Sequence, residues 1–75
     1  MSNKTIEVRS EITGNVWKIE VSLNDKVEEG DLLITLESMK MEIPILAPVS
    51  GLVKEIKVNE GSSVQGEEVV MLLSE

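Results

Sequence analysis

The stretch Glu37-Ser38-Met39-Lys40-Met41-Glu42 lies between two apolar alternating runs, residues 32–36 and 43–45. Alternation of this kind predicts two β-strands joined by a tight turn. A two-residue hairpin turn usually contains Gly, Asn or Asp, because its central residues need a positive φ. This turn offers Met and Lys instead. A turn that departs from the local rule is expected where function maintains it, and we expect Lys40 to be the reason.

The length of the turn also fixes the register of the two strands. Centred on Met39 and Lys40, the turn pairs Ser38 with Met41, Glu37 with Glu42, and Leu36 with Ile43. Two carboxylates then face each other, which is mildly destabilising, and two methionines lie at an exposed tip. Both features are unfavourable for the isolated chain and make sense if another protein recognises the tip.

The pattern of the first half of the chain returns in the second half. With an offset of 37 residues, Ile6 falls on Ile43, Gly14 on Gly51, Val16 on Val53, Ile19 on Ile56, Val21 on Val58 and Val27 on Val64. The irregular 16/19/21 spacing, which predicts a β-bulge near Trp17, returns with it. If one residue is then deleted, the offset becomes 36, and Gly30 falls on Gly66 and Leu36 on Leu72.

Two such copies suit a pair of sheets related by a pseudo-two-fold axis, in which each half covers the apolar face of the other. A composition rich in Val, Ile and Leu but poor in Ala also favours strands over helices. We expect one domain over residues 1–75, with halves at about 5–37 and 42–73 joined by the hairpin at 38–41. The hairpin should lie at one extremity and the chain ends at the other. The initiating Met and the end after the last predicted strand favour a free-standing protein.

The chain has neither histidine nor cysteine. Histidine is the commonest general base and a common metal ligand, and cysteine supplies disulfides and thiolate metal sites. The carboxylates of residues 28–31 lack the dense, ordered oxygen ligands of a calcium loop. We therefore expect no catalytic residue and no metal site, and a domain on which other enzymes act.

The net charge is −7, from 14 acidic and 7 basic residues. Nucleic-acid binding through a basic patch is therefore not expected. The acidity serves solubility or steers the chain toward basic clefts on partner enzymes. No run approaches membrane length, and the N-terminal residues lack the apolar core of a signal peptide. We expect a cytoplasmic monomer, with the ring of Trp17 partly in the core.

The stretch around Lys40 resembles the attachment motif of biotin carrier domains, usually Ala-Met-Lys-Met, with Ser38 in place of Ala. Residues 47–51 (Ala-Pro-Val-Ser-Gly) and 27–33 (Val-Glu-Glu-Gly-Asp-Leu-Leu) also match the family, and the resemblance covers roughly residues 6–73. It implies an all-β fold, a flattened eight-stranded β-barrel or sandwich (a barrel-sandwich hybrid) with a quasi-two-fold internal repeat. Residues 22–26 leave no room for the protruding thumb of some acetyl-CoA carboxylase carrier domains. The match is therefore better to small free-standing biotin/lipoyl attachment proteins.

The resemblance also implies a function. A biotin protein ligase would join biotin to the Lys40 amine through an amide bond. The arm would then carry a carboxyl group between a biotin carboxylase site and a carboxyltransferase site. The domain would catalyse neither reaction, and would contribute the tether that keeps the group at high effective concentration. Met39, Met41, Ser38 and Glu37 are the residues that we expect the ligase to recognise.

Other interpretations stay open. A lipoyl carrier of an oxo-acid dehydrogenase or glycine cleavage system uses the same fold and lysine, and a lipoate ligase would then modify Lys40. Lipoyl domains usually carry Asp-Lys-Ala at the tip, whereas methionines flank Lys40 here. Glu37, three residues before the lysine, does fit the lipoyl pattern, so a dual biotin/lipoyl acceptor is a further alternative. An unmodified β-sandwich adaptor domain is the last one, and the Met-Lys-Met tip disfavours it.

Overall fold

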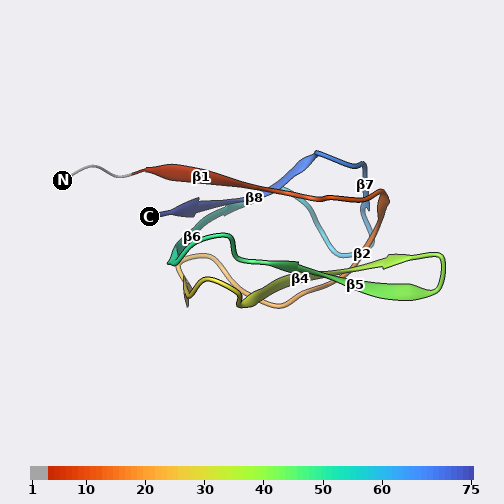
Figure 1. Cartoon of the computed structure of the whole chain (residues 1–75), viewed down its shortest axis with the longest axis horizontal. Coiled ribbons are helices and arrows are strands. Elements are labelled where there is room, and N and C mark those ends of the chain that lie inside the picture. Colours follow the sequence, from red (N-terminus) through yellow and green to blue (C-terminus); the bar gives the residue numbers. More distant parts are fainter. Residues whose placement is uncertain (1–3) are drawn as a thin grey trace.

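The computed structural model describes residues 4–75, which form eight strands and no helix. The strands are β1 (Thr5–Arg9), β2 (Gly14–Ile19), β3 (Lys26–Val27), β4 (Leu32–Ser38), β5 (Met41–Leu46), β6 (Gly51–Ile56), β7 (Ser63–Val64) and β8 (Val69–Ser74). They build two antiparallel four-stranded sheets, of order β1-β8-β6-β3 and β5-β4-β2-β7 (Figure 1). The expected all-β, eight-stranded fold class is confirmed.

An internal two-fold relation exchanges the two sheets. The order β1-β8-β6-β3 becomes β5-β4-β2-β7 when each strand is replaced by the strand four places away in the chain. Hydrogen bonds in the loops recur in the same way. The Asn24 amide donates to the Val53 carbonyl at 2.8 Å, and the Gly61 amide donates to the Val16 carbonyl at 2.8 Å. The predicted repeat at an offset of 37 is therefore confirmed in the backbone.

Each half contains a β-bulge at the same place. The register of β2 against β4 shifts between Val16 and Lys18, and that of β6 against β8 shifts between Val53 and Glu55. The bulge predicted near Trp17 is thus confirmed. The prediction that Trp17 is partly in the core is wrong, because its side chain is 55% exposed. Its neighbour Val16 occupies the buried face, and successive residues of a strand point to opposite faces.

The one-residue deletion proposed for the second half is also wrong, because the offset of 37 persists through the last turn. The Gly30 amide donates to the Ala47 carbonyl at 2.8 Å, and the Glu67 amide donates to the Ser10 carbonyl at 2.6 Å. The positive φ of Gly30, 92°, is matched by a φ of 72° at Glu67 rather than at Gly66. In the second half the glycine, Gly66, lies one residue before the position equivalent to Gly30. The backbone conformation at that equivalent position, Glu67, is nevertheless the same.

The core lies between the two sheets and draws on both halves. Its buried hydrophobic side chains are Val8, Val16, Val27, Leu33, Ile34, Leu36, Ile45, Ala47, Val53, Val58, Val64, Val70, Met71 and Leu73. Leu36 pairs with Ile43 in the same way that Leu73 pairs with Ile6. The counterpart of Leu36 is therefore Leu73, and the match to Leu72 at an offset of 36 is wrong.

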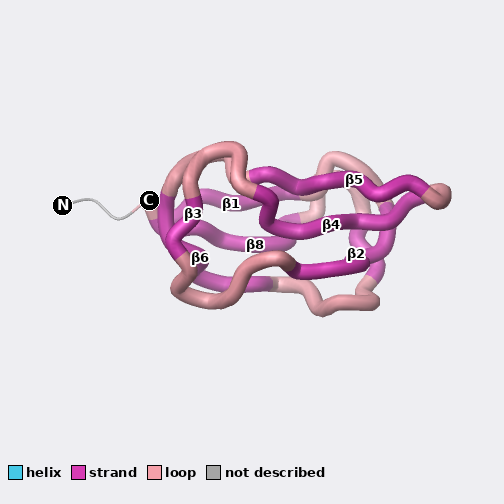
Figure 2. The backbone as a smooth tube through the Cα atoms, turned by 90° about the horizontal axis from the view of Figure 1, so that it is seen from below, coloured by secondary structure: helices cyan, strands magenta, loops and turns pink. Residues whose placement is uncertain are grey.

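The molecule is elongated, with extents of 43 × 18 × 18 Å. The β4–β5 hairpin projects from one end, while the start of β1 and the end of β8 lie together at the other (Figure 2). The predicted placement of the hairpin opposite the chain ends is confirmed. Within residues 4–75 no helix is long and apolar enough to cross a membrane.

Candidate functional site

The tip of the β4–β5 hairpin has the register that the sequence predicts. The ladder pairs Leu36 with Ile43, Glu37 with Glu42, and Ser38 with Met41. Two residues, Met39 and Lys40, then close the hairpin. All the residues expected to form the site, Glu37, Ser38, Met39, Lys40 and Met41, are thus brought together at one extremity of the fold (Figure 2).

The backbone of the turn is left-handed at both central residues. Met39 has a φ of 52° and Lys40 a φ of 66°. Positive φ at both positions defines the type I′ turn, which suits the twist of a hairpin and normally contains Asn or Gly. For other L-residues this conformation costs about 1–2 kcal/mol per residue. The departure from the local turn rule that the sequence indicated is therefore present in the backbone.

The side chains at the tip are presented to solvent. Met39 is 91% exposed and Met41 is 62% exposed, and Lys40 is exposed between them. The ion pairs formed within residues 4–75 involve Arg9, Lys18 and Lys57 but not Lys40. The Lys40 amine therefore forms no ion pair with a carboxylate of residues 4–75 and is accessible to a second molecule.

The two faces of the hairpin differ in character at the tip. Paired residues of an antiparallel ladder lie on the same face, and the next pair lies on the other face. Glu37 and Glu42 therefore form an exposed acidic pair on one face. Ser38 and Met41 lie on the opposite face. A partner that binds Lys40 meets carboxylates on one side and an apolar thioether on the other.

The end of β4 next to the turn packs against β2 at a glycine. A Cβ atom at Gly14 would lie 2.8 Å from the Glu37 carbonyl oxygen and 3.3 Å from the Cβ of Ser38. Real Cβ contacts are longer, so only glycine lets β2 approach the hairpin this closely. The sequence indicated Gly14 only as part of the repeat and did not reveal this supporting role. Its recurrence as Gly51, which meets the Ser74 carbonyl in the same way, was the available signal.

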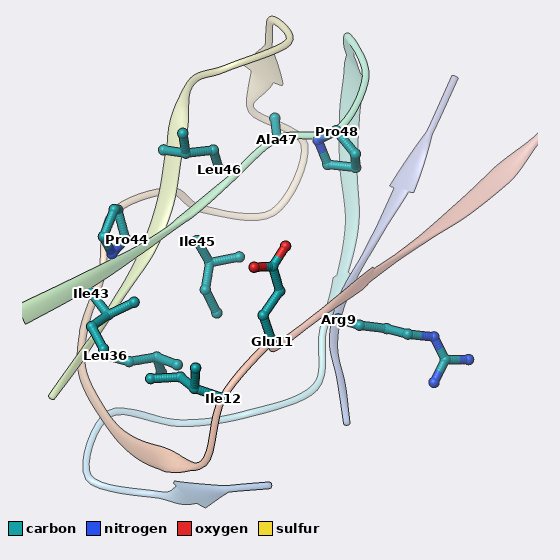
Figure 3. A pocket seen from close by; sticks show the side chains of 10 residues that line it. All are labelled: Arg9, Glu11, Ile12, Leu36, Ile43, Pro44, Ile45, Leu46, Ala47 and Pro48. Carbon is teal, nitrogen blue, oxygen red and sulfur yellow. The ribbon is translucent and has the colours of Figure 1, made fainter. Parts of the chain in front are cut away.

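A pocket of about 410 Å³ lies beside the hairpin, between β5 and the segment that follows β1 (Figure 3). Leu36, Ile43 and Ile45 give it an apolar floor. The Glu11 carboxylate points into the pocket, whereas the Arg9 guanidinium points away from it (Figure 3). None of the residues that the sequence analysis assigned to the site lines this pocket, and the sequence did not predict it.

No cluster of three or more carboxylates within residues 4–75 is arranged to hold a metal ion. The functional group at the tip of the hairpin is the primary amine of Lys40, and two four-stranded sheets support that hairpin. These features define a class of protein, a small β domain with an exposed lysine in the turn of a projecting hairpin.

The sequence matches the model of the "Biotin-requiring enzyme" family over residues 6–73, and the chain belongs to this family. It is 48% identical over 67 residues to the biotin/lipoyl attachment protein of Bacillus subtilis, which covers 89% of this chain and 92% of that protein. It is 43% identical over 68 residues to the biotinylated protein TB7.3 homolog of Mycobacterium leprae, covering 91% of this chain and 96% of that one.

The fold has a close counterpart in a much larger protein. The structure of the urea carboxylase of Kluyveromyces lactis aligns with a TM-score of 0.89 and 33% identity, over 97% of this chain and 6% of that chain. The resemblance to the biotin/lipoyl attachment family is thereby confirmed. The chain is similar to small attachment proteins and to part of a carboxylase, and it has the form of a biotin carboxyl carrier domain.

Proposed function

We propose that this chain is a biotin carboxyl carrier and that Lys40 is its attachment site. The observation that carries the proposal is the placement of Lys40 in a strained two-residue turn at the extremity opposite the chain ends. A biotin protein ligase would form an amide between the Lys40 amine and the biotin carboxyl group. The ligase would recognise the residues next to Lys40 in the hairpin, namely Met39, Met41, Ser38 and Glu37.

The bound biotin would supply a ring nitrogen that accepts a carboxyl group and releases it again. The chain itself would take part by presentation, and as a carrier it would catalyse neither transfer. Its partners would be a biotin carboxylase and a carboxyltransferase, an assignment supported by the likeness to a carboxylase chain. A body 43 Å long places the tip well away from the chain ends, and tethering raises the local concentration of the arm at both sites.

The same proposal takes residues 1–75 as one carrier unit, whose halves meet at the hairpin and which acts as a monomer in the cytoplasm. The pairing of both sheets across the two halves supports a single unit. Light scattering of the purified chain, before and after modification, should give the mass of one copy. A stable dimer would contradict the monomer.

The test of the attachment site is co-expression with a biotin protein ligase, followed by intact mass spectrometry and peptide mapping. One biotinyl adduct per chain is expected, on Lys40. Lys40→Arg should abolish it, because a guanidinium keeps the charge but is a far weaker nucleophile. Lys26→Arg is the matched control, since Lys26 is also an exposed lysine but lies in β3, away from the tip. An adduct that survives Lys40→Arg would refute the site.

Lipoylation is the second candidate, and the acidic position Glu37 favours it. A lipoate ligase would then modify the same lysine, and one of the similar proteins is itself a biotin/lipoyl attachment protein. Parallel co-expression with a lipoate ligase gives the ratio of the two adducts. We expect the double variant Met39→Asp, Met41→Ala to move that ratio toward lipoate. An unchanged ratio would place selectivity outside the two methionines.

The absence of any adduct with either ligase would exclude both carriers. An unmodified adaptor domain would then be the remaining interpretation. A circular dichroism spectrum of the same sample would show that the chain was folded when the ligases met it.

A further inference from the structure

The methionines of the chain fall into two structural classes. Met39 and Met41 flank Lys40, and their side chains are 91% and 62% exposed. Met71 lies in β8 at the centre of the core and is fully buried. Met1 lies outside the described residues. The most accessible thioethers of residues 4–75 are thus the immediate neighbours of the one lysine at the tip.

We propose that Met39 and Met41 form an oxidation site that controls modification of Lys40. Conversion of either thioether to its sulfoxide would lower acceptance of Lys40 by the ligase, and reduction of the sulfoxide would restore it. This inference rests on the proposed function, because it needs Lys40 to be a ligase substrate. The reagent class is a peroxide, of which hydrogen peroxide is the simplest member.

The chemistry of the step is balanced by the peroxide. A lone pair of the methionine sulfur attacks one peroxide oxygen, the O–O bond breaks, and an S–O bond forms. The departing hydroxide takes up the hydroxyl proton, so that the products are one sulfoxide and one water. A sulfoxide reductase reverses the change with electrons from a thiol, and one enzyme serves each sulfoxide epimer.

The expected effect is local because of where the two side chains lie. Neither Met39 nor Met41 contributes to the buried core, so oxidation leaves the two sheets intact. A ligase that takes Lys40 into its site must cover the residues beside it. Oxidation turns an apolar, flexible side chain into a polar one, and covering an unpaired polar group is unfavourable.

The register strengthens this argument for Met41. Met41 pairs with Ser38 at the last rung of the ladder, so its backbone is fixed and its side chain direction is set. A polar oxygen added there cannot be moved to the other face without breaking the hairpin. Met39, in the turn itself, is the more exposed of the two and should be oxidised first.

The test begins with the unmodified chain, treated with hydrogen peroxide and mapped by mass spectrometry of its peptides. Sulfoxide is expected at Met39 and Met41 while Met71 stays reduced. The treated and untreated chains are then given to a biotin protein ligase with biotin and ATP. We expect kcat/KM to fall at least about tenfold, the effect of leaving a buried polar group unpaired. Treatment with both sulfoxide reductases and a thiol should recover the initial rate.

The double variant Met39→Leu, Met41→Leu is the matched control. Whatever its own rate, that rate should be the same before and after peroxide, because leucine has no sulfur to oxidise. Equal rates for oxidised and reduced chains would overturn the inference while leaving Lys40 as the attachment site. A rate loss that peroxide still causes in the double variant would also overturn it. If the untreated, folded chain is not accepted, the proposed function itself fails, and the inference fails with it.

Discussion

The two halves of the molecule have the same backbone conformation, but their glycines occupy different turns. The turn after β2 has a φ of 71° at Asn24, and its counterpart after β6 has 91° at Gly61. In the next pair of turns the glycine is in the first half. The turn after β3 has a φ of 92° at Gly30, and its counterpart after β7 has a φ of 72° at Glu67. The same hydrogen bonds form in both halves. The network of hydrogen bonds therefore determines the conformation, and glycine only lowers its cost.

The tip of the β4–β5 hairpin is the region in which the two halves are connected. The pair at the base of the turn, Ser38 and Met41, corresponds to the meeting of Glu75 with Lys4, where the Glu75 amide donates to the Lys4 carbonyl at 2.9 Å. Beyond Ser38 the first half continues into Met39 and Lys40, which connect it to the second half. Both of these residues are left-handed and neither is glycine. The turn therefore carries backbone strain at two consecutive residues, about 1–2 kcal/mol at each.

The largest expected effect concerns the core, where the halves should behave alike. Leu36 and Leu73 are equivalent and fully buried. Truncation of either to Ala should lower the free energy of unfolding by about 2–5 kcal/mol, a large share of the stability of so small a domain. Urea denaturation followed by far-UV circular dichroism measures both. Leu52→Ala, at a leucine that is 47% exposed, is the control with a much smaller loss. If Leu36→Ala and Leu73→Ala differ as much as either differs from Leu52→Ala, the halves are not energetically equivalent.

The next effect separates the halves by function. Ala at Gly14 or Gly51 forces a Cβ against a carbonyl of the adjacent strand, so each variant should lose about 1–3 kcal/mol of stability. Only Gly14 contacts Glu37, which lies near the end of β4 beside the turn. Gly14→Ala should therefore also slow ligase acceptance of Lys40, measured by the initial rate of adduct formation, whereas Gly51→Ala should not. Gly66→Ala, whose added Cβ would have only ordinary contacts, controls for the substitution itself. Equal rates in Gly14→Ala and Gly51→Ala would refute the role of Gly14.

Much of this fold could be predicted from the sequence because its signals are local and repeated. The hairpin register follows from alternation and a two-residue turn, and the repeated bulge follows from the repeated 16/19/21 spacing. The position of Lys40 at an extremity follows from the repeat alone. The chemistry of the site could not be obtained in this way, since one exposed lysine carries no signal of its own and the motif is known only by resemblance.

The errors share a physical origin. Gly66 was aligned with Gly30 because glycine is expected wherever φ is positive, yet Glu67 takes that conformation within an intact network. Trp17 was expected in the core because an aromatic ring is usually buried, yet its neighbour Val16 holds the inward position beside the bulge. In both cases the hydrogen-bonded backbone determines the conformation or the direction of the residue, and the usual preference of that residue type does not. The pocket beside β5 was missed because it is lined by residues from separate parts of the chain.

Adding a glycine in one half and removing one in the other should change the free energy of unfolding by smaller amounts, with opposite signs. Glu67→Gly removes a left-handed L-residue and should raise stability by about 0.5–1 kcal/mol, the strain relieved less the added freedom of the unfolded chain. Gly30→Ala should lower stability by about 1 kcal/mol for the same reason. Thermal unfolding of the two variants beside the parent gives both signs. A loss of stability in Glu67→Gly would mean that its side chain contributes more than its backbone costs.

The smallest effect is expected at the tip, where stability and recognition should move in opposite directions. Met39→Asn places a residue that tolerates positive φ in the turn, so the free energy of unfolding measured in urea should rise by a few tenths of a kcal/mol to about 1 kcal/mol. The same change removes an exposed apolar side chain beside Lys40 and should slow adduct formation by the ligase. Met39→Gly also relaxes the backbone and removes the methionine but adds no polar group, so it separates loss of the apolar side chain from addition of a polar one. If Met39→Asn gains stability and keeps its full rate, the methionine is not maintained for recognition, and the strain at the tip needs another explanation.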